Sequence, residues 1–330
     1  MKKIPAQLFK TVLKIVQPDK LKSKDAYTYP PPIITAPPAL APAAMADNSA
    51  QDIPKIIWTY WNHAQPDSFV MDCIGSWKKH CSDYQVQLVH PENIGHFVQA
   101  GALPTIFLDL HPTKQSDWLR LYLVAKHGGF WLDASTLLTT SLDWMRSPPQ
   151  GSTGFTGFYL KKFTHDMQFP VVESWAFGAS SSHPFIQRWQ QEFHHALIEL
   201  GTETYLAQLQ QRPDWRVLRQ GIKDPQYLLI HITAQKVLRD IETAPLALYK
   251  AEDSAYFYHQ LLRWKWYLLY PQLCLARSPS MHAPLIKLRG GERRHFSEMQ
   301  RLHGPARPGS LWHQALHGAI SAPQRTLPQP

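Results

Sequence analysis

Three charged residues near the middle of the chain have the types and spacing of a ligand site. Asp117 and Arg120 lie three apart in SDWLRLYLVAKHGG, and Asp133 directly follows the apolar residues FWL. Residues three apart share one face of a helix, and a carboxylate at the end of a buried strand is costly without a partner. An arginine binds phosphates or sugar hydroxyls through its planar fork, and a carboxylate beside it can bind Mg²⁺ or Mn²⁺ that in turn holds a diphosphate. A buried structural Asp–Arg pair is the alternative.

The elements around these residues are expected to bring them together. Residues 116–129 predict a helix with Ser116 as N-cap, Asp117 in the first turn, and Gly128 or Gly129 at its end. The following apolar residues predict a buried strand, so Asp133 lies at or just past its carboxyl end. Ligands of open α/β sheets bind at that edge.

The order of elements predicts an α/β fold. Residues 53–61, IPKIIWTYW, indicate a buried first strand, residues 68–80 a helix, and residues 84–90 a second strand. A β-α-β order implies a right-handed crossover. After residue 150 we expect a strand and a long helix from about His183, then a helix over 225–241.

Composition limits the classes of partner. The 330 residues carry a formal net charge of +9, which favours anionic partners without choosing among them. The basic residues are scattered and no nucleic-acid-binding motif is found, so we expect no nucleic-acid partner. Three cysteines without a CxxC pair argue against a disulfide scaffold or a zinc site. No apolar run is long enough to span a bilayer.

The chain divides into four expected parts. Residues 1–24 form a basic amphipathic segment, which suits either contact with an anionic membrane or a disordered tail. Residues 25–50 are a Pro/Ala-rich linker. Residues 51–295 form the main domain, and residues 296–330 a C-terminal tail containing one short helix.

The motifs together resemble a known family. IPKIIWTYW, then S-D-x-x-R, then G-G-x-W-x-D, in this order and spacing, resemble the sugar-binding DXD region of glycosyltransferase family 32 and its bacterial capsular-polysaccharide-synthesis relatives. The resemblance is good over about residues 53–145 and looser to about 290. It implies a GT-A-like fold, a Rossmann-type mixed sheet flanked by helices with helical additions.

The resemblance also implies roles for individual residues. Trp58 matches the aromatic residue that stacks on the donor base, Asp117 and Arg120 match the pair that grips the donor sugar, and Asp133 matches the first acid of the DXD motif. The second acid is replaced by Ser135, a poorer ligand for a hard cation. Mn²⁺ or Mg²⁺ held by Asp133 and Ser135 is therefore expected only with weakened affinity.

Two further segments resemble the family more loosely. The segment 173–185 matches a part that faces the acceptor, which implies contacts from Glu173 and Trp175. Glu173 would be a polar contact or a base, and a structural role is the alternative. The segment 281–294 implies that the diphosphate and leaving nucleotide are bound by His282, Lys287 and Arg289. A solvated basic loop is the alternative there.

The resemblance implies a hexosyltransferase that moves a sugar, with retention at the anomeric carbon. Its donor would be a UDP- or GDP-sugar, and its acceptor a hydroxyl of a polysaccharide, lipopolysaccharide or capsule glycan, or a glycolipid. We expect it in the cytoplasm, in peripheral contact with the inner face of the cytoplasmic membrane through residues 1–24. A binding relic of the same fold without turnover is the alternative.

Overall fold

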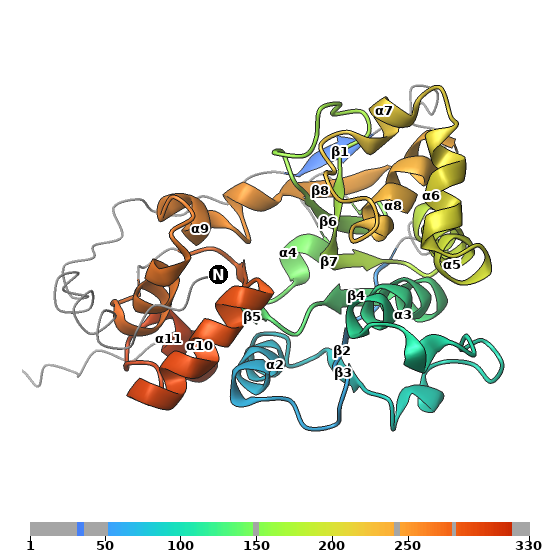
Figure 1. Cartoon of the computed structure of the whole chain (residues 1–330). Helices are drawn as coiled ribbons and strands as arrows, with labels where there is room; N and C mark the ends of the chain where they lie inside the picture. Colours follow the sequence, from blue (N-terminus) through green and yellow to red (C-terminus); the bar gives the residue numbers. More distant parts are fainter. Residues whose placement is uncertain (1–31, 36–51, 148–151, 241–244, 279–281, 319–330) are drawn as a thin grey trace, which may run out of the picture.

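A mixed seven-stranded sheet runs through the described part of the chain (Figure 1). Its strand order is β1-β8-β6-β7-β4-β2-β3. Strand β2 pairs in parallel with β3 and β4, while β7 runs antiparallel to both β4 and β6. The expected α/β architecture, a mixed sheet flanked by helices, is confirmed. The strands are β1 Ile33–Thr35, β2 Ile56–Tyr60, β3 Gln85–Val89, β4 Gly129–Leu132, β5 Thr136–Leu138, β6 Phe155–Tyr159, β7 Val172–Ala179, β8 Leu246–Lys250 and β9 Leu285–Lys287.

The computed structural model describes residues 32–35, 52–147, 152–240, 245–278 and 282–318. The expected basic segment 1–24 lies outside these residues, as does most of the linker 25–50. The described part of that linker is β1, which pairs with β8 at the edge of the sheet. The α-helices are α2 Ser68–His80, α3 Pro112–His127, α4 Asp143–Arg146, α5 Pro184–His194, α6 Thr202–Gln210, α7 Trp215–Arg219, α8 Leu229–Asp240, α9 Phe257–Leu261, α10 Gly290–His303 and α11 Leu311–His317.

Helices cover both faces of the sheet (Figure 1). Helices α3, α5 and α8 pack together on one face, over a core that includes Trp131 and Trp189. Helix α2 covers the other face with α10 and α11, over a core that includes Phe69 and Trp312. A second sheet of β5 and β9 lies on the α2 side and pairs Thr136 with Lys287.

Helix α3 begins earlier than the sequence predicts. Its N-cap is His111, whose side chain accepts from the backbone N–H of Thr113, and Pro112 occupies the first turn. Proline suits this position because its fixed φ is already helical and its missing N–H is not needed there. The prediction of Ser116 as N-cap was therefore wrong. Ser116 lies inside the helix and points to the site instead.

Two glycines make the turn from α3 into β4 possible. Gly128 and Gly129 have φ values of 68° and 97°, a region that favours glycine. A Cβ on Gly129 would lie 2.7 Å from the carbonyl oxygen of Ile56 on the neighbouring strand. The glycine pair therefore lets β4 lie directly against β2, which places Asp133 at the sheet edge.

The C-terminal boundary differs from the prediction. The expected boundary between residues 295 and 296 falls inside α10. Residues 296–318 are not a separate tail, because Phe296 and Trp312 are both fully buried against Phe69 of α2. The short helix expected in this region is present as α11, whereas α10 was not predicted.

Candidate functional site

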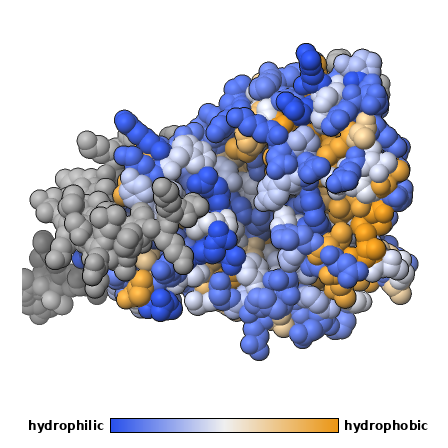
Figure 2. All heavy atoms as spheres, in the orientation of Figure 1, coloured by the Kyte–Doolittle hydropathy of each residue, from blue (hydrophilic) through white to orange (hydrophobic). Residues whose placement is uncertain are grey.

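A polar pocket of about 410 Å³ lies beyond the carboxyl ends of β2 and β4. Figure 2 shows mainly hydrophilic residues around the centre of the visible face, and an apolar area on the side of α5. A volume of this size lies in the usual range for small-molecule sites. The described lining residues are Tyr60, Trp61, Asn62, Pro112, Thr113, Ser116, Arg120, Asp133, Ala134, Ser135, Tyr227, Lys287, Gly290 and Arg293.

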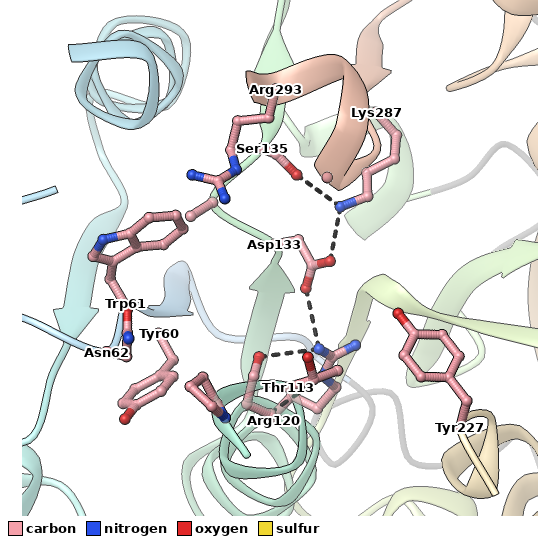
Figure 3. A pocket seen from close by; sticks show the side chains of 14 residues that line it. Tyr60, Trp61, Asn62, Thr113, Arg120, Asp133, Ser135, Tyr227, Lys287 and Arg293 are labelled. Atoms are coloured by element: carbon pink, nitrogen blue, oxygen red, sulfur yellow. Dashed lines mark hydrogen bonds and ion pairs between the residues drawn. The ribbon is translucent and has the colours of Figure 1, made fainter. Parts of the chain in front are cut away.

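Asp133 lies at the centre of this pocket, between two cations (Figure 3). Its Oδ1 lies 3.2 Å from Nη2 of Arg120, and its Oδ2 accepts from Nζ of Lys287 at 2.7 Å. Trp131 also donates to Oδ1 from its indole nitrogen, at 3.1 Å. Burial alone would raise the pKa of Asp133, but Lys287 and Arg120 outweigh it and lower the pKa. Asp133 is therefore ionised at neutral pH.

Arg120 is held in one orientation by contacts with three elements. Its Nη1 donates to both the backbone oxygen and Oγ of Ser174 on β7, each at 2.8 Å. Its Nη2 donates to Oγ of Ser116 at 3.0 Å and lies 3.2 Å from Oδ1 of Asp117. The guanidinium packs over the Trp131 ring. These contacts preorganise the arginine toward Asp133.

Asp117 supports Arg120 and does not belong to the described lining of the pocket. Its side chain is buried, with Arg120 at 3.2 Å and Lys114 at 4.0 Å. Burial raises the pKa of Asp117, opposed by Arg120 and then by Lys114. The predicted trio of Asp117, Arg120 and Asp133 is thus brought together, with Asp117 behind the arginine.

Lys287 reaches the pocket from the second sheet. Its Nζ donates to Asp133 at 2.7 Å and to Oγ of Ser135 at 2.9 Å. Its side chain is 8% exposed and lies over the face of Trp175. The pairing of Lys287 with Thr136 in β5–β9 fixes the backbone from which the side chain extends.

The prediction that Trp58 stacks on a ligand was wrong. Trp58 is 4% exposed, donates to the backbone oxygen of Gly128 at 2.9 Å and packs against Phe97 and His127. The accessible tryptophan at the end of the same strand is Trp61, which lines the pocket. The apolar run around β2 indicated an aromatic residue at the sheet edge, but not which tryptophan emerges from the core.

Of the three residues expected to bind the diphosphate, Lys287 lines the pocket and the other two do not. His282 lies before β9, and burial lowers its pKa. Arg289 caps α10 and donates from Nε to Glu292 at 2.8 Å. Arg293, one helical turn later, was not predicted, although it lines the pocket and packs over the ring of Trp61.

The two residues expected on the acceptor side lie behind the pocket lining. Glu173 is 5% exposed, and burial raises its pKa to about 8 although Lys287 opposes the shift. Trp175 is stacked on Phe158, with ring centroids 4.8 Å apart. Neither residue belongs to the described lining of the pocket, and Trp175 contributes instead by packing against the ammonium of Lys287.

The residues at Asp133 and Ser135 do not fit a divalent cation. Both oxygens of Asp133 are engaged by Arg120, Trp131 or Lys287, and Oγ of Ser135 accepts from Lys287. Hard divalent cations need several oxygen ligands, usually including more than one carboxylate or a phosphate. Within the described part of the chain, no three His, Cys, Asp or Glu side chains are grouped to hold a metal ion.

Other lining residues that the sequence analysis missed are Tyr60, Asn62, Thr113 and Tyr227. Tyr60 and Asn62 flank Trp61 at the end of β2. Their position next to the segment IPKIIWTYW, which carries the resemblance, could have indicated that they belong to the site. Tyr227 precedes α8 and is 60% exposed, and nothing in its local sequence indicates a site.

Comparison with known proteins gives one family match. Residues 41–197 match the family described as Capsular polysaccharide synthesis protein. No curated protein matches the chain.

Three solved structures are similar at low identity. The PaToxG glycosyltransferase is 12% identical, with 80% of this chain and 87% of that chain covered and a TM-score of 0.33. A glycosyltransferase involved in glycosylation of the major capsid of PBCV-1 is 8% identical, with 76% and 100% covered and a TM-score of 0.36. The galactosyltransferase LgtC, in complex with donor and acceptor sugar analogues, is 11% identical, with 58% and 86% covered and a TM-score of 0.29. TM-scores this low carry no argument about this chain.

Proposed function

We propose that the chain, whose residues 41–197 match the family described as Capsular polysaccharide synthesis protein, is a glycosyltransferase that uses a UDP- or GDP-sugar. The acceptor is a hydroxyl of a growing capsule polysaccharide, lipopolysaccharide glycan or glycolipid. One observation carries the proposal: the ionised Asp133 is held between Arg120 and Lys287, in a pocket at the carboxyl edge of the sheet.

The charge of the pocket suits a nucleotide diphosphate. Among the described lining residues, the cations are Arg120, Lys287 and Arg293, and the carboxylate is Asp133. The excess of positive charge complements the two negative charges of a diphosphate ester. We assign the diphosphate to the side of Lys287 and Arg293, and the sugar and ribose hydroxyls to Asp133 and Arg120.

The nucleotide base has an aromatic partner in the pocket. Trp61 lines the pocket, and its ring packs against the guanidinium of Arg293. Stacking of a base on an aromatic ring contributes about 1–3 kcal/mol. Trp61 therefore takes the role that the sequence analysis gave to Trp58.

The chemistry requires stabilisation of a leaving group more than a protein nucleophile. The bond between the anomeric carbon and the diphosphate oxygen breaks, and its electrons remain on the diphosphate. The acceptor oxygen bonds to the anomeric carbon, and its proton passes to the departing diphosphate. Cations that are already in place before the reaction stabilise the negative charge that grows on the leaving diphosphate oxygen. Retention at the anomeric carbon follows from the family resemblance.

The location of the enzyme follows from its acceptor. We place it in the cytoplasm, with residues 1–24 in contact with the inner membrane face, where basic amphipathic segments bind anionic lipid. Among the helices of the described residues, none has the length and apolarity needed to cross a membrane. Loss of liposome binding on deletion of residues 1–24 would support this contact, and unchanged binding would contradict it.

A second candidate is a relic that binds nucleotide or glycan without turnover. It is favoured by Ser135, which stands where the resemblance leads us to expect a second acid. Lys287, fixed against both Asp133 and Ser135, argues for retained function because a cation still occupies the centre of the site.

Nucleotide release tests the proposal. Purified protein is incubated with UDP- and GDP-sugars, with and without acceptor glycans, and freed UDP or GDP is measured. Release from one donor, lost in Asp133→Ala and retained in the exposed control Asp109→Ala, is the expected result. Nucleotide binding without release, with every acceptor tried, would favour the relic.

A further inference from the structure

We infer that the ammonium of Lys287 takes the place of a divalent cation at the leaving diphosphate, so that this transferase works without a metal ion. The inference rests on the proposed function and deepens it. It starts from one observation, that a single ammonium bridges Asp133 and Ser135, at 2.7 and 2.9 Å (Figure 3).

The position of this ammonium is fixed by the fold. The Lys287 backbone N–H donates to the carbonyl of Ala255 at 3.2 Å, and the strand pairs with Thr136. The side chain is 8% exposed and lies over the ring of Trp175. A cation held in this way needs little reorganisation when negative charge develops beside it.

A divalent ion at the same place would meet strong repulsion. Like charges this close repel strongly at the effective dielectric near protein surfaces, and the double charge of a divalent ion doubles the repulsion from each cation. Such an ion would lie close to both Lys287 and Arg120, which flank Asp133. Its protein ligands would be one carboxylate, already paired twice, and one hydroxyl.

The same wall of the pocket offers further donors for the diphosphate. Arg293 and Gly290, both on α10, line the pocket with Lys287. Arg293 keeps its guanidinium over Trp61, with a long contact of 3.4 Å to Asp67. Lys287 thus supplies the buried charge, and Arg293 a second, more accessible one. Lys287 donates hydrogen bonds to the departing oxygen without transferring a proton.

Binding of UDP and GDP, measured by calorimetry in EDTA and then in Mn²⁺, tests the inference directly. We expect the wild-type protein to bind its nucleotide with nearly equal affinity in both conditions. Lys287→Met should weaken binding roughly 10- to 100-fold, the loss of one charge-assisted hydrogen bond. The matched control is Lys250→Met, whose lysine pairs with Asp253 outside the pocket and should bind as wild type.

A double variant tests the exchange of lysine for metal. Lys287→Ala with Ser135→Asp removes the ammonium and adds a carboxylate next to Asp133, so nucleotide binding should become dependent on Mn²⁺. If either variant fails to fold, as judged by circular dichroism, the wild-type measurement in EDTA and Mn²⁺ still decides.

The outcomes separate the inference from the proposed function. Binding and sugar transfer that disappear in EDTA and return with Mn²⁺ would overturn the metal-free inference and leave the transferase intact. Unchanged affinity in folded Lys287→Met would also overturn it. Absence of binding and turnover with every nucleotide sugar, with or without Mn²⁺, would reject the proposed function and the inference together.

Discussion

The guanidinium of Arg120 connects the carboxylates of the site to the sheet behind it. It contacts Asp117 and Asp133, and it donates to Ser116 of its own helix and to Ser174 of β7. Asp117 is buried and depends on this partner. Removing one member of a buried ion pair leaves an uncompensated charge, which is more costly than losing an exposed pair.

We expect Arg120→Met to lower the free energy of unfolding by about 3–5 kcal/mol and to abolish sugar transfer. The control is Arg212→Met, because Arg212 forms its ion pairs with Asp214 and Asp240 at a more exposed position. That variant should lose about 0.2–1 kcal/mol. Urea unfolding measures both variants, and equal losses would contradict the role given to Arg120.

Substituting the two tryptophans near the end of β2 should have different effects, one on nucleotide binding and the other on stability. Trp61→Ala should weaken nucleotide binding by about 1–3 kcal/mol through lost stacking, with little change in stability. Trp58→Ala should cost about 3–5 kcal/mol of stability, because it empties a buried site. Calorimetry and thermal unfolding distinguish them, and a fully stable Trp58→Ala that fails to bind nucleotide would reverse the assignment.

Residue types and spacing predicted part of this site. The apolar residues before Asp133 and the helical spacing of Asp117 and Arg120 were enough to bring these three together. The predictions that Trp58 and Arg289 contact the ligand were wrong for the same reason. Each has a neighbour of the same chemistry, Trp61 or Arg293, and only the packing of the finished fold decides which side chain reaches the pocket.

Among the elements, α11 is the short helix expected in the C-terminal tail, but it packs into the core instead of lying in a separate tail. Its Trp312 is fully buried between Phe69 and Phe296, and its indole N–H donates to Asp72 of α2 at 3.0 Å. The helix has seven residues, too few to be stable alone, so its stability comes from this packing.

We expect Trp312→Ala to destabilise the protein by about 3–5 kcal/mol, since a large buried ring is removed. Leu302→Ala, on the same terminal region but 42% exposed, should change stability by less than about 0.5 kcal/mol. Thermal unfolding of both variants makes the comparison. A Trp312→Ala protein as stable as wild type would restore the interpretation of residues 296–318 as a tail.

Short strands that pair with distant parts of the chain could not be predicted from the sequence. Strands β2 and β4 and helix α2 have strong apolar patterns, and the bounds of each were predicted to within three residues. Strands β5 and β9 have three residues each, and their pairing brings together distant parts of the chain. No local periodicity indicates such a pair, although it is the pair that carries Lys287.

For the whole molecule, the buried Glu173 makes stability depend on pH. Burial raises its pKa to about 8 from an ordinary 4.5. Between these values the folded protein keeps a proton that the unfolded chain releases. The free energy of unfolding therefore falls as pH rises through this window.

We expect Glu173→Gln to remove this dependence. Near pH 8 the variant should be more stable than wild type by on the order of 4 kcal/mol, because each pKa unit corresponds to about 1.4 kcal/mol. Urea unfolding at several pH values from 4.5 to 8 measures the slope. The exposed Glu203→Gln serves as control, and parallel slopes in all three proteins would contradict the prediction.

The separation of Asp133 and Lys287 along the chain has a consequence for synthesis. They lie 154 residues apart, and translation at about 5–20 residues per second takes roughly 8–30 s to cover that distance. Throughout this interval a nascent chain on the ribosome has the carboxylate without its ammonium. Unfinished or prematurely terminated chains therefore lack the ion pair between Asp133 and Lys287, and under the proposed function they could not consume activated sugar before the enzyme is whole.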